Sequence, residues 1–517
     1  MSIDAQENSD KARMTPVLER SETQHEGQVA ESRLEQTRFS LWSTIGIQFA
    51  VATPPLAIPS YTVLIVGAGG SPFFFWAFLL AAVGQMLIAF SLAELASAYP
   101  DASGQVYWTA AAVRSPRWKA FLSYLSGAMA FFGWIFACGG GAVLTAHFVT
   151  GLGVLISETY SPSTWQIYLL VLAAFLCAVL FNTLLIQTLP AISIFMIVFL
   201  NAAALFIFIT LLAKTHPKAS AETAFLDVLN ETGWDSDGVV FFLSIMPGLL
   251  TICLFDTAAH MAEELPQPER QVPIVMLANA GLAVVSALIM VIALIFCTTH
   301  PENLTAPLAG LPILQICWDA WPSKGYVIVI CIIYWASMLN ALVSMLTGCS
   351  RLTWSFTKLG SLRYKAWLSQ VHPTLHVPSN AVYFSAFLAI LFSLLVFGPS
   401  TVLNGLFGSA TLCFSISYAL PIGLTLVNRA RLPAQRYCNL GKFGAAVNML
   451  ALAWILIAIV FASFPTYLPV TSETINWAPC FFGIVLVLSL GNWILAQESY
   501  EPPRGLLVAG LDRPGHA

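Results

Sequence analysis

The hydrophobic pattern of the chain consists of long, continuous apolar runs separated by short polar segments. A helix needs about 20 mostly apolar residues to cross a bilayer, and continuous rather than alternating runs exclude membrane strands. The pattern therefore predicts an all-α integral membrane protein with twelve transmembrane helices. The predicted spans lie near residues 40–65, 72–97, 119–152, 164–185, 188–213, 238–262, 273–297, 325–350, 379–398, 401–427, 443–464 and 475–496.

Composition supports a membrane location. The 517-residue chain is 58% hydrophobic and 9% charged, with a mean hydropathy of +0.78, whereas soluble domains carry about 25% charged residues. The lipid bilayer is therefore the expected partner of most of the surface, and no nucleic-acid partner is expected. The polar residues 1–38 are predicted to form a disordered cytosolic tail, residues 39–497 the membrane domain, and residues 498–517 a cytosolic C-terminal tail.

Basic residues are distributed unevenly between the predicted loops. With the N-terminus in the cytosol, all of the 22 lysines and arginines except Lys214, Lys218 and Lys324 fall on the inner side, as the positive-inside rule requires. The sequons at Asn230 and Asn303 then lie in the two longest outer loops, where they are candidates for glycosylation. The sequence thus predicts a multi-pass protein with both termini in the cytosol.

The ten cysteines are scattered singly through apolar runs and form no CxxC pair. We interpret them as small buried hydrophobic residues, and we expect neither a metal nor a cofactor. Cys297 and Cys317 flank one predicted outer loop, so a disulfide between them remains an open alternative.

Two of the predicted helices are interrupted in matching ways. The first reads FAVATPPLAIPSY, with Pro54, Pro55 and Pro59 in mid-span, and the sixth reads SIMPGLLTICLFD, with Pro247 and Gly248 near its middle. One proline is commonly a harmless kink, but freed backbone groups are tolerated in a membrane only where protein or water satisfies them. Two breaks five helices apart favour two five-helix halves related by an inverted repeat, with a transporter-type site at the breaks and two peripheral helices.

Four ionisable residues follow the second break within nine positions. If this segment is helical, Asp256, His260, Glu263 and Glu264 share one face. An unpaired charge deep in lipid costs about 2.5–3.5 kcal/mol or more, so that face should meet protein or a water-filled vestibule. We interpret Glu263 and Glu264 as a solvated helix end beside Arg270. Asp256 has two interpretations that can both hold, a helix N-cap or a site of proton–substrate exchange.

Several longer stretches resemble the amino acid–polyamine–organocation superfamily. SLAELASAYPDASGQVYWTAA (91–111) resembles the second-helix and loop signature of its amino acid permeases. FDTAAHMAEELPQPERQVPIVM (255–276) resembles the sixth-helix signature of its amino acid/choline transporter branch, which includes the fungal GABA and choline permeases. The same branch is matched by SRLTWSFTKLGSL (350–362), HPTLHVPSNAV (372–382), NLGKFGAAVNMLALAW (439–454) and FPTYLPVTSETINWA (464–478).

The resemblance implies the leucine-transporter fold, with five-plus-five inverted repeats in twelve helices. It also implies uptake of amino acids or related amines, with a proton as the coupling ion, at the plasma membrane. Two departures leave the substrate open: TKLGSLR stands where relatives often read ARDGGLP, and Pro54-Pro55 stands where relatives vary. The substrate-binding candidates that follow from the resemblance are Thr53, Pro54, Leu56, Thr251, Leu254, Phe255, Asp256 and Asn340.

The candidates for proton coupling are Asp256 and Glu94. Glu94 lies near the inner end of the second span, where a structural role as partner of an arginine or of backbone N–H groups is favoured. Trp134, in the third span, is interpreted as aromatic packing. Asn340 shares a helix face with Ser344, and polar residues in membrane helices more often join neighbouring helices than bind ligands.

Three alternative functions compete with secondary active transport by alternating access. An enzyme lacks a catalytic constellation, because His260-x-x-Glu263 falls short of the usual zinc patterns. A channel would need a charged or carbonyl-lined filter. A non-transporting nutrient sensor of the same fold is the remaining alternative.

Overall fold

The computed structural model describes residues 39–157, 159–398 and 402–503. The predicted tail 1–38 and most of the predicted tail 498–517 lie outside the described residues. Within them all the regular secondary structure is helical, apart from one isolated bridge between Ala68 and Asn230. The regular structure is thus all-α, as the hydrophobic pattern predicts.

The described residues contain the twelve predicted spans. Eleven are helical segments long and apolar enough to cross a membrane, and the twelfth is the interrupted sixth span at residues 237–260. The helices of the spans are α2 (Leu41–Ala52) with α3 (Pro54–Ser60), α4 (Gly70–Ala98), α6 (Pro116–Ile156), α7 (Thr164–Asn182), α8 (Leu189–Lys214), α10 (Asp237–Leu243) with α11 (Met246–Thr251) and α12 (Thr257–His260), α13 (Pro268–Cys297), α15 (Lys324–Lys358), α17 (Ser379–Ser393), α18 (Val402–Val427), α19 (Gly444–Ser463) and α20 (Ala478–Ala496).

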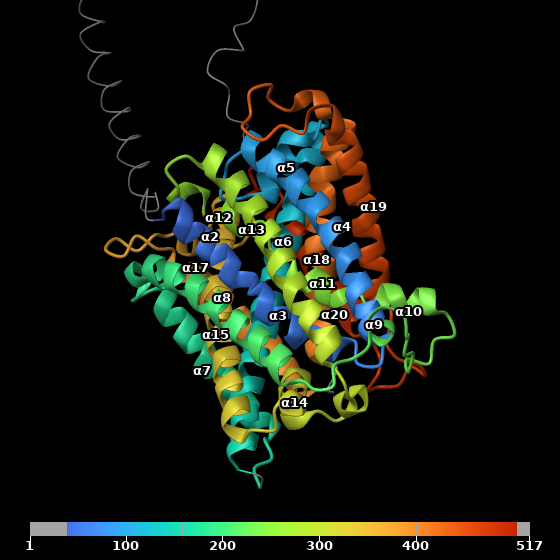
Figure 1. The fold of residues 1–517 in the computed structure, drawn as a ribbon. Helices are drawn as coiled ribbons and strands as arrows, with labels where there is room; N and C mark the ends of the chain where they lie inside the picture. The colour runs from blue at the N-terminus through green and yellow to red at the C-terminus, as the bar shows by residue number, and fades with distance from the viewer. Residues whose placement is uncertain (1–38, 158, 399–401, 504–517) are drawn as a thin grey trace, which may run out of the picture.

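Short helices outside the spans mark the two ends of the bundle. Helix α5 (Gln105–Ala112) lies at one end, which we call the α5 end, and α9 (Ala221–Phe225) and α14 (Pro312–Ala320) lie at the other, the α14 end (Figure 1). The described chain begins and finishes at the α5 end, because Phe39 N–H donates to Glu264 O and Glu501 N–H donates to Leu359 O. A short helix α16 (Lys365–Leu368) follows α15.

Helices five apart in the order of spans lie side by side. The second span α4 packs against the seventh, α13, and the third span α6 packs against the eighth, α15. The fourth span α7 packs against the ninth, α17, while α19 and α20 pack on the tenth span α18. This pairing, together with breaks in the first and sixth spans, is the arrangement of a five-plus-five inverted repeat with two added helices.

Burial identifies the centre of the bundle. In its most apolar stretch, α6 has 94% of its residues buried inside the protein, whereas α20 has 17%. Helix α6 packs against α15, α18, α5 and α17. It is therefore the central helix of the bundle and contacts helices of both halves. The weakly buried α20 lies at the periphery, where its apolar side chains face lipid.

The break in the first span follows from two consecutive prolines. Pro54 and Pro55 have no N–H, so the carbonyls of Ala50 and Val51 lose their helical donors. Thr53 takes a left-handed conformation (φ 39°), and its carbonyl accepts from the N–H groups of Leu56 and Ala57, which starts α3. The span therefore crosses as two half-helices with free carbonyl oxygens between them.

The break in the sixth span contains no proline and is held by glutamines from other helices. Between α11 and α12, Leu254 is left-handed (φ 59°). Gln85 Nε2 on α4 donates to the carbonyls of Leu249 and Ile252. Gln48 on α2 donates to Phe255 O at 3.2 Å and accepts from Ala258 N–H at 3.1 Å. Side chains thus replace the missing helical hydrogen bonds, as a break at membrane depth requires.

Candidate functional site

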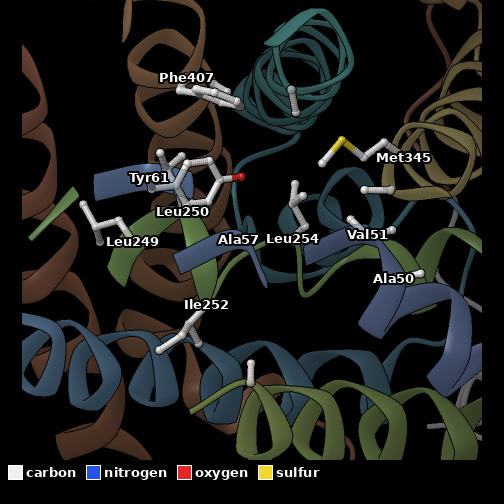
Figure 2. Close-up of a cluster of buried hydrophobic side chains, with 14 of the residues drawn as sticks. Ala50, Val51, Ala57, Tyr61, Leu249, Leu250, Ile252, Leu254, Met345 and Phe407 are labelled. Atoms are coloured by element: carbon white, nitrogen blue, oxygen red, sulfur yellow. The ribbon is translucent and has the colours of Figure 1, made fainter. Parts of the chain in front are cut away.

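A cavity lies between the two breaks, in the middle of the bundle. Its volume is about 50 Å³, which is room for a few water molecules, so a larger ligand requires its walls to move apart. Figure 2 shows the labelled side chains around the broken segments of the first and sixth spans. The lining residues include Val51, Tyr61, Gln85, Leu249, Leu250, Cys253, Leu254, Met345, Phe407, Phe414 and Tyr418.

The lining chemistry suits an ammonium group. Among the described residues that line the cavity, none carries a formal charge, and four are aromatic: Tyr61, Phe407, Phe414 and Tyr418. Aromatic faces attract cations, and quaternary ammonium ligands are recognised in this way. Val51 also lines the cavity, and its carbonyl is one of the two freed by the proline pair. The cavity therefore offers partial negative charge without a fixed anion.

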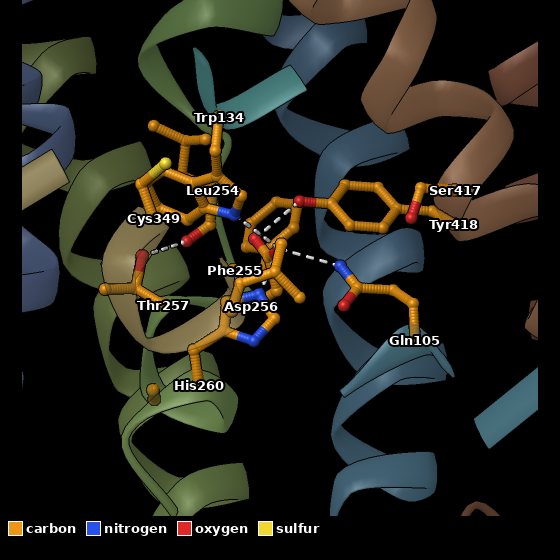
Figure 3. A network of polar contacts seen from close by, with 12 residues as sticks. Gln105, Trp134, Leu254, Phe255, Asp256, Thr257, His260, Cys349, Ser417 and Tyr418 are labelled. Atoms are coloured by element: carbon orange, nitrogen blue, oxygen red, sulfur yellow. Dashed lines mark hydrogen bonds and ion pairs between the residues drawn. The ribbon is translucent and has the colours of Figure 1, made fainter. Parts of the chain in front are cut away.

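A buried carboxylate lies behind the cavity and gathers donors from four parts of the fold. Asp256 is fully buried. Its Oδ2 accepts from Gln105 Nε2 at 2.7 Å and Trp134 Nε1 at 3.0 Å and contacts His260 Nε2 at 3.0 Å, while Oδ1 accepts from Tyr418 OH at 2.8 Å. Figure 3 shows these side chains converging on Asp256 from α5, α6, α12 and α18. Such a set of donors holds an ionised carboxylate at membrane depth.

Tyr418 connects the two features. It lines the cavity, and its hydroxyl donates to Asp256. It also stacks on Phe414 with ring centroids 5.8 Å apart, so the ring is fixed between the ligand space and the carboxylate. A ligand in the cavity can therefore influence Asp256 without touching it.

The N-cap interpretation of Asp256 is wrong. Asp256 occupies the N-cap position of α12, but its side chain makes no capping hydrogen bond. Gln48 Oε1 accepts from Ala258 N–H instead. The carboxylate is turned away from the helix start because four side-chain donors compete for it, and each of them would otherwise be buried without a partner.

The structure separates the predicted substrate-binding residues into two groups. Leu254 lines the cavity, and Phe255 and Asp256 lie directly behind it against Tyr418. The others do not line the cavity: Thr53 and Pro54 form the break in the first span, Leu56 is buried in α3, Thr251 donates to Pro247 O, and Asn340 lies half-buried on α15.

Sequence reasoning missed Gln48, Gln85, Gln105 and Tyr418, and it favoured packing over a place in the pocket wall for Trp134. The signal that could have found the first two is a lone amide inside an apolar run, because each lies in a predicted span and must be satisfied by another helix. Trp134 and Tyr418 carry no comparable signal, since aromatic residues are common throughout these spans.

Glu94, the second candidate for proton coupling, is held at the α5 end by arginines. Its carboxylate is 2.8 Å from Arg429 Nη2 and 2.8 Å from Arg436 Nη2, and it also accepts from Leu440 N–H. This geometry matches the structural role that the sequence favours, joining α4 to the loop before α19.

The two glutamates after His260 do not form a solvated helix end beside Arg270. Helix α12 ends at His260 and a 3-10 turn follows, so regular helical spacing no longer applies. Glu264 turns inward and pairs with Arg351 of α15 at 3.0 Å, with both side chains fully buried. Glu263 remains partly exposed, 3.9 Å from Lys358, and Arg270 stacks on Tyr437 instead.

The two sequons differ in accessibility at the α14 end. Asn230 is half-buried, and its amide donates to Trp234 O and Asp237 and accepts from Thr232, the threonine of its own sequon. Asn303 is exposed, and its side-chain amide donates to the carboxylate of Asp319. At the same end, Cys297 at the end of α13 and Cys317 within α14 are both buried free thiols, so the structure contains no disulfide between them.

We expect Asn303 to be the glycosylated sequon. Asn303→Gln should increase mobility on a denaturing gel, and Asn230→Gln should leave mobility unchanged, because glycosylation of Asn230 would disrupt the hydrogen bonds that shape its loop. The test compares both variants before and after enzymatic deglycosylation. A mobility change from Asn230→Gln alone would contradict the assignment.

Comparison with known proteins gives a consistent picture. Residues 39–487 match the family model described as amino acid permease. The chain is 31% identical over 441 residues to a choline transporter of Saccharomyces cerevisiae, covering 85% of this chain and 78% of that protein. It is 25% identical to amino-acid permease 2 of Neurospora crassa (89% and 85% covered) and 25% identical to an amino-acid permease BAT1 homolog of Oryza sativa subsp. japonica (89% and 91% covered).

Proposed function

Because the chain belongs to the amino acid permease family, and is therefore a multi-pass membrane transporter rather than an enzyme, we propose that it imports a small amine or amino acid by proton symport. GABA and choline represent the substrate class. The observation that supports this most directly is the uncharged, aromatic cavity between two helix breaks, linked by Tyr418 to a buried carboxylate.

The substrate is a zwitterion or a cation. A dianionic substrate such as glutamate would need a lysine or arginine to balance its second carboxylate, and the described residues lining the cavity include neither. An ammonium group is served by the aromatic rings and by the carbonyl of Val51, which is freed because Pro55 has no N–H. One of the relatives is named as a choline transporter, and choline carries such a group.

Proton coupling supplies enough energy for accumulation. One charge that crosses 100 mV gains about 2.3 kcal/mol, so a membrane at roughly 150 mV supports about 300-fold accumulation of a neutral substrate. Asp256 is a group at which a proton and an ammonium could compete, because it is buried and adjoins the cavity wall. Alternating access would then expose the cavity to one side of the membrane at a time.

The protein is proposed to lie in the plasma membrane, with its α5 end facing the cytosol. Both ends of the described chain lie at the α5 end, and Lys214, Lys218 and Lys324 lie at or beyond the helix ends at the α14 end (Figure 1). This distribution agrees with the positive-inside rule. Import would then run from the α14 end to the α5 end.

Competition of radiolabelled uptake tests the proposed substrate class. In cells that lack related permeases, we expect the protein to take up labelled GABA or choline, with unlabelled amines and neutral amino acids competing and glutamate and aspartate failing to compete. Uptake should fall when a protonophore is added and should persist without sodium. Preference for glutamate, or uptake that collapses only on sodium removal, would contradict the proposal; a sensor would reach the surface and show no uptake of any probe.

A further inference from the structure

The ring of His260 lies between two oxygen acceptors and is completely buried. Its Nδ1 is 2.9 Å from Ala102 O, and its Nε2 is 3.0 Å from Asp256 Oδ2. A carbonyl oxygen only accepts, so Nδ1 carries a hydrogen. The contact between Nε2 and Oδ2 also needs one hydrogen, because two lone pairs would repel each other at this distance.

The hydrogen between the two groups belongs to the histidine. Asp256 Oδ2 already accepts from Gln105 and Trp134, and Oδ1 accepts from Tyr418. An ionised carboxylate is an acceptor only and satisfies all of these donors, whereas a protonated Oδ2 would use its hydrogen toward His260 and accept the two N–H groups poorly. The geometry is therefore that of an imidazolium paired with a carboxylate.

Among the residues that the structure describes, none around the pair offers another balancing charge. The titratable groups that face it are Tyr418 on α18, Cys253 in the break and Cys349 on α15, and phenols and thiols are neutral in their ordinary forms. Glu264 and Arg351 beyond the pair neutralise each other. If His260 lost its proton, the carboxylate would be left as a buried, uncompensated charge, which is strongly unfavourable.

The hydrogen bonds of the pair also hold the α5 end closed. His260 on α12 is tied to the loop before α5 through Ala102 O, and Asp256 is tied to α5, α6 and α18. Ser355 on α15 donates to the same Ala102 carbonyl. Separation of α12 from these elements would expose both groups to water, and only then could the proton leave without stranding a buried charge.

We propose that His260 is the residue that carries the coupling proton, and that release of this proton accompanies opening of the α5 end. The inference rests on the proposed proton symport and assigns its proton to a residue that does not touch the cavity. In the loading step, water in the cavity gives a proton to the Tyr418 oxygen while the Tyr418 hydroxyl hydrogen moves to Asp256 Oδ1. Rotation of the carboxyl group then brings this hydrogen to His260, where the O–H bond breaks and the Nε2–H bond forms. In the release step, the Nε2–H bond breaks and the proton passes to water at the α5 end; no other bond changes.

Replacement of His260 by glutamine tests this role. The amide Nε2 of glutamine can donate to Asp256, but glutamine cannot gain or lose a proton at neutral pH. The parent and His260→Gln are purified into liposomes with a pH-sensitive dye inside, and labelled choline or GABA is added outside. For His260→Gln we expect proton entry with substrate to disappear and net uptake to lose its dependence on the pH gradient, while exchange of labelled for unlabelled substrate falls far less.

His147→Gln is the matched control. His147 is a membrane histidine on α6 whose ring contacts no carboxylate among the described residues, so this variant should keep the proton-to-substrate ratio of the parent. If His260→Gln fails to reach the membrane, His260→Asn, which can keep the hydrogen bond to Ala102 O, takes its place with the same expected result.

The outcomes separate this inference from the proposed function. If the parent moves protons with substrate and the His260 variant does so at the same ratio, the assignment to His260 is overturned while proton symport stands. If the parent itself moves labelled substrate without protons, proton symport fails and the inference fails with it. Loss of proton entry in His147→Gln as well would show a general effect of membrane histidines and would also overturn the assignment.

Discussion

Asp256→Asn is expected to reach the membrane at the level of the parent yet lose the ability to concentrate substrate. The asparagine oxygen can accept from Gln105 and Trp134, and its NH₂ can donate to Tyr418, so the packing survives. The charge that balances a protonated His260 is gone, and the driving force of one proton is lost with it. For a neutral substrate at roughly 150 mV, the accumulation ratio should fall from as much as about 300-fold toward unity.

The measurement is steady-state accumulation of labelled GABA between pH 4 and 7, normalised to surface protein. Asp235→Asn, the same substitution at an exposed position before α10, serves as control and should accumulate like the parent. Accumulation by Asp256→Asn equal to the parent over this pH range would show that the carboxylate only positions its neighbours.

Arg351→Gln is expected to destabilise the protein far more than Lys358→Gln. Arg351 and Lys358 each form an ion pair with one of two consecutive glutamates. The side chains of Arg351 and Glu264 are fully buried and 3.0 Å apart. Those of Lys358 and Glu263 are each about one-third exposed and 3.9 Å apart. Removing one partner of a buried pair leaves an uncompensated charge and costs about 3–5 kcal/mol. An exposed pair contributes only about 0–1 kcal/mol.

Thermal unfolding of the detergent-purified variants, followed by size-exclusion chromatography, measures this difference. A double variant, Arg351→Met with Glu264→Leu, should recover much of the lost stability, because a buried pair replaced by apolar side chains of similar volume leaves no stranded charge. Equal melting temperatures for Arg351→Gln and Lys358→Gln would contradict the prediction.

The spans and their order could be predicted because each depends on local chemistry. A continuous apolar run must be helical in lipid, and two consecutive prolines in mid-span, Pro54 and Pro55, remove two helical hydrogen bonds and so interrupt the helix. The sixth span is interrupted at Ser244–Ile245, directly before Pro247, as the sequence predicts, because Pro247 is accepted only in the first turn of a new helix, α11. A second and wider break after Thr251 was not predicted. Long-range side-chain bonds from Gln48 and Gln85 decide its position.

The candidate site was predicted in part for the same reason. Spacing alone brought Asp256 and His260 to one face, and the structure pairs them. The same spacing failed at Glu264, because the helix ends at His260 and the chain turns toward α15. Gln105, Trp134 and Tyr418 reach Asp256 from helices far away in sequence, and no local pattern encodes that convergence.

The two breaks differ in permanence. In the first span the missing hydrogen bonds follow from covalent structure, because no rearrangement gives Pro54 or Pro55 an N–H group. The interruption of this span is therefore expected in every conformation. In the sixth span, residues 252–256 all keep their N–H groups. The side-chain amides of Gln85 and Gln48 donate hydrogen bonds to carbonyls of this break. These bonds can be exchanged for others of similar strength, about 1 kcal/mol each. We therefore expect the break in the sixth span to change between conformations more readily than the break in the first span.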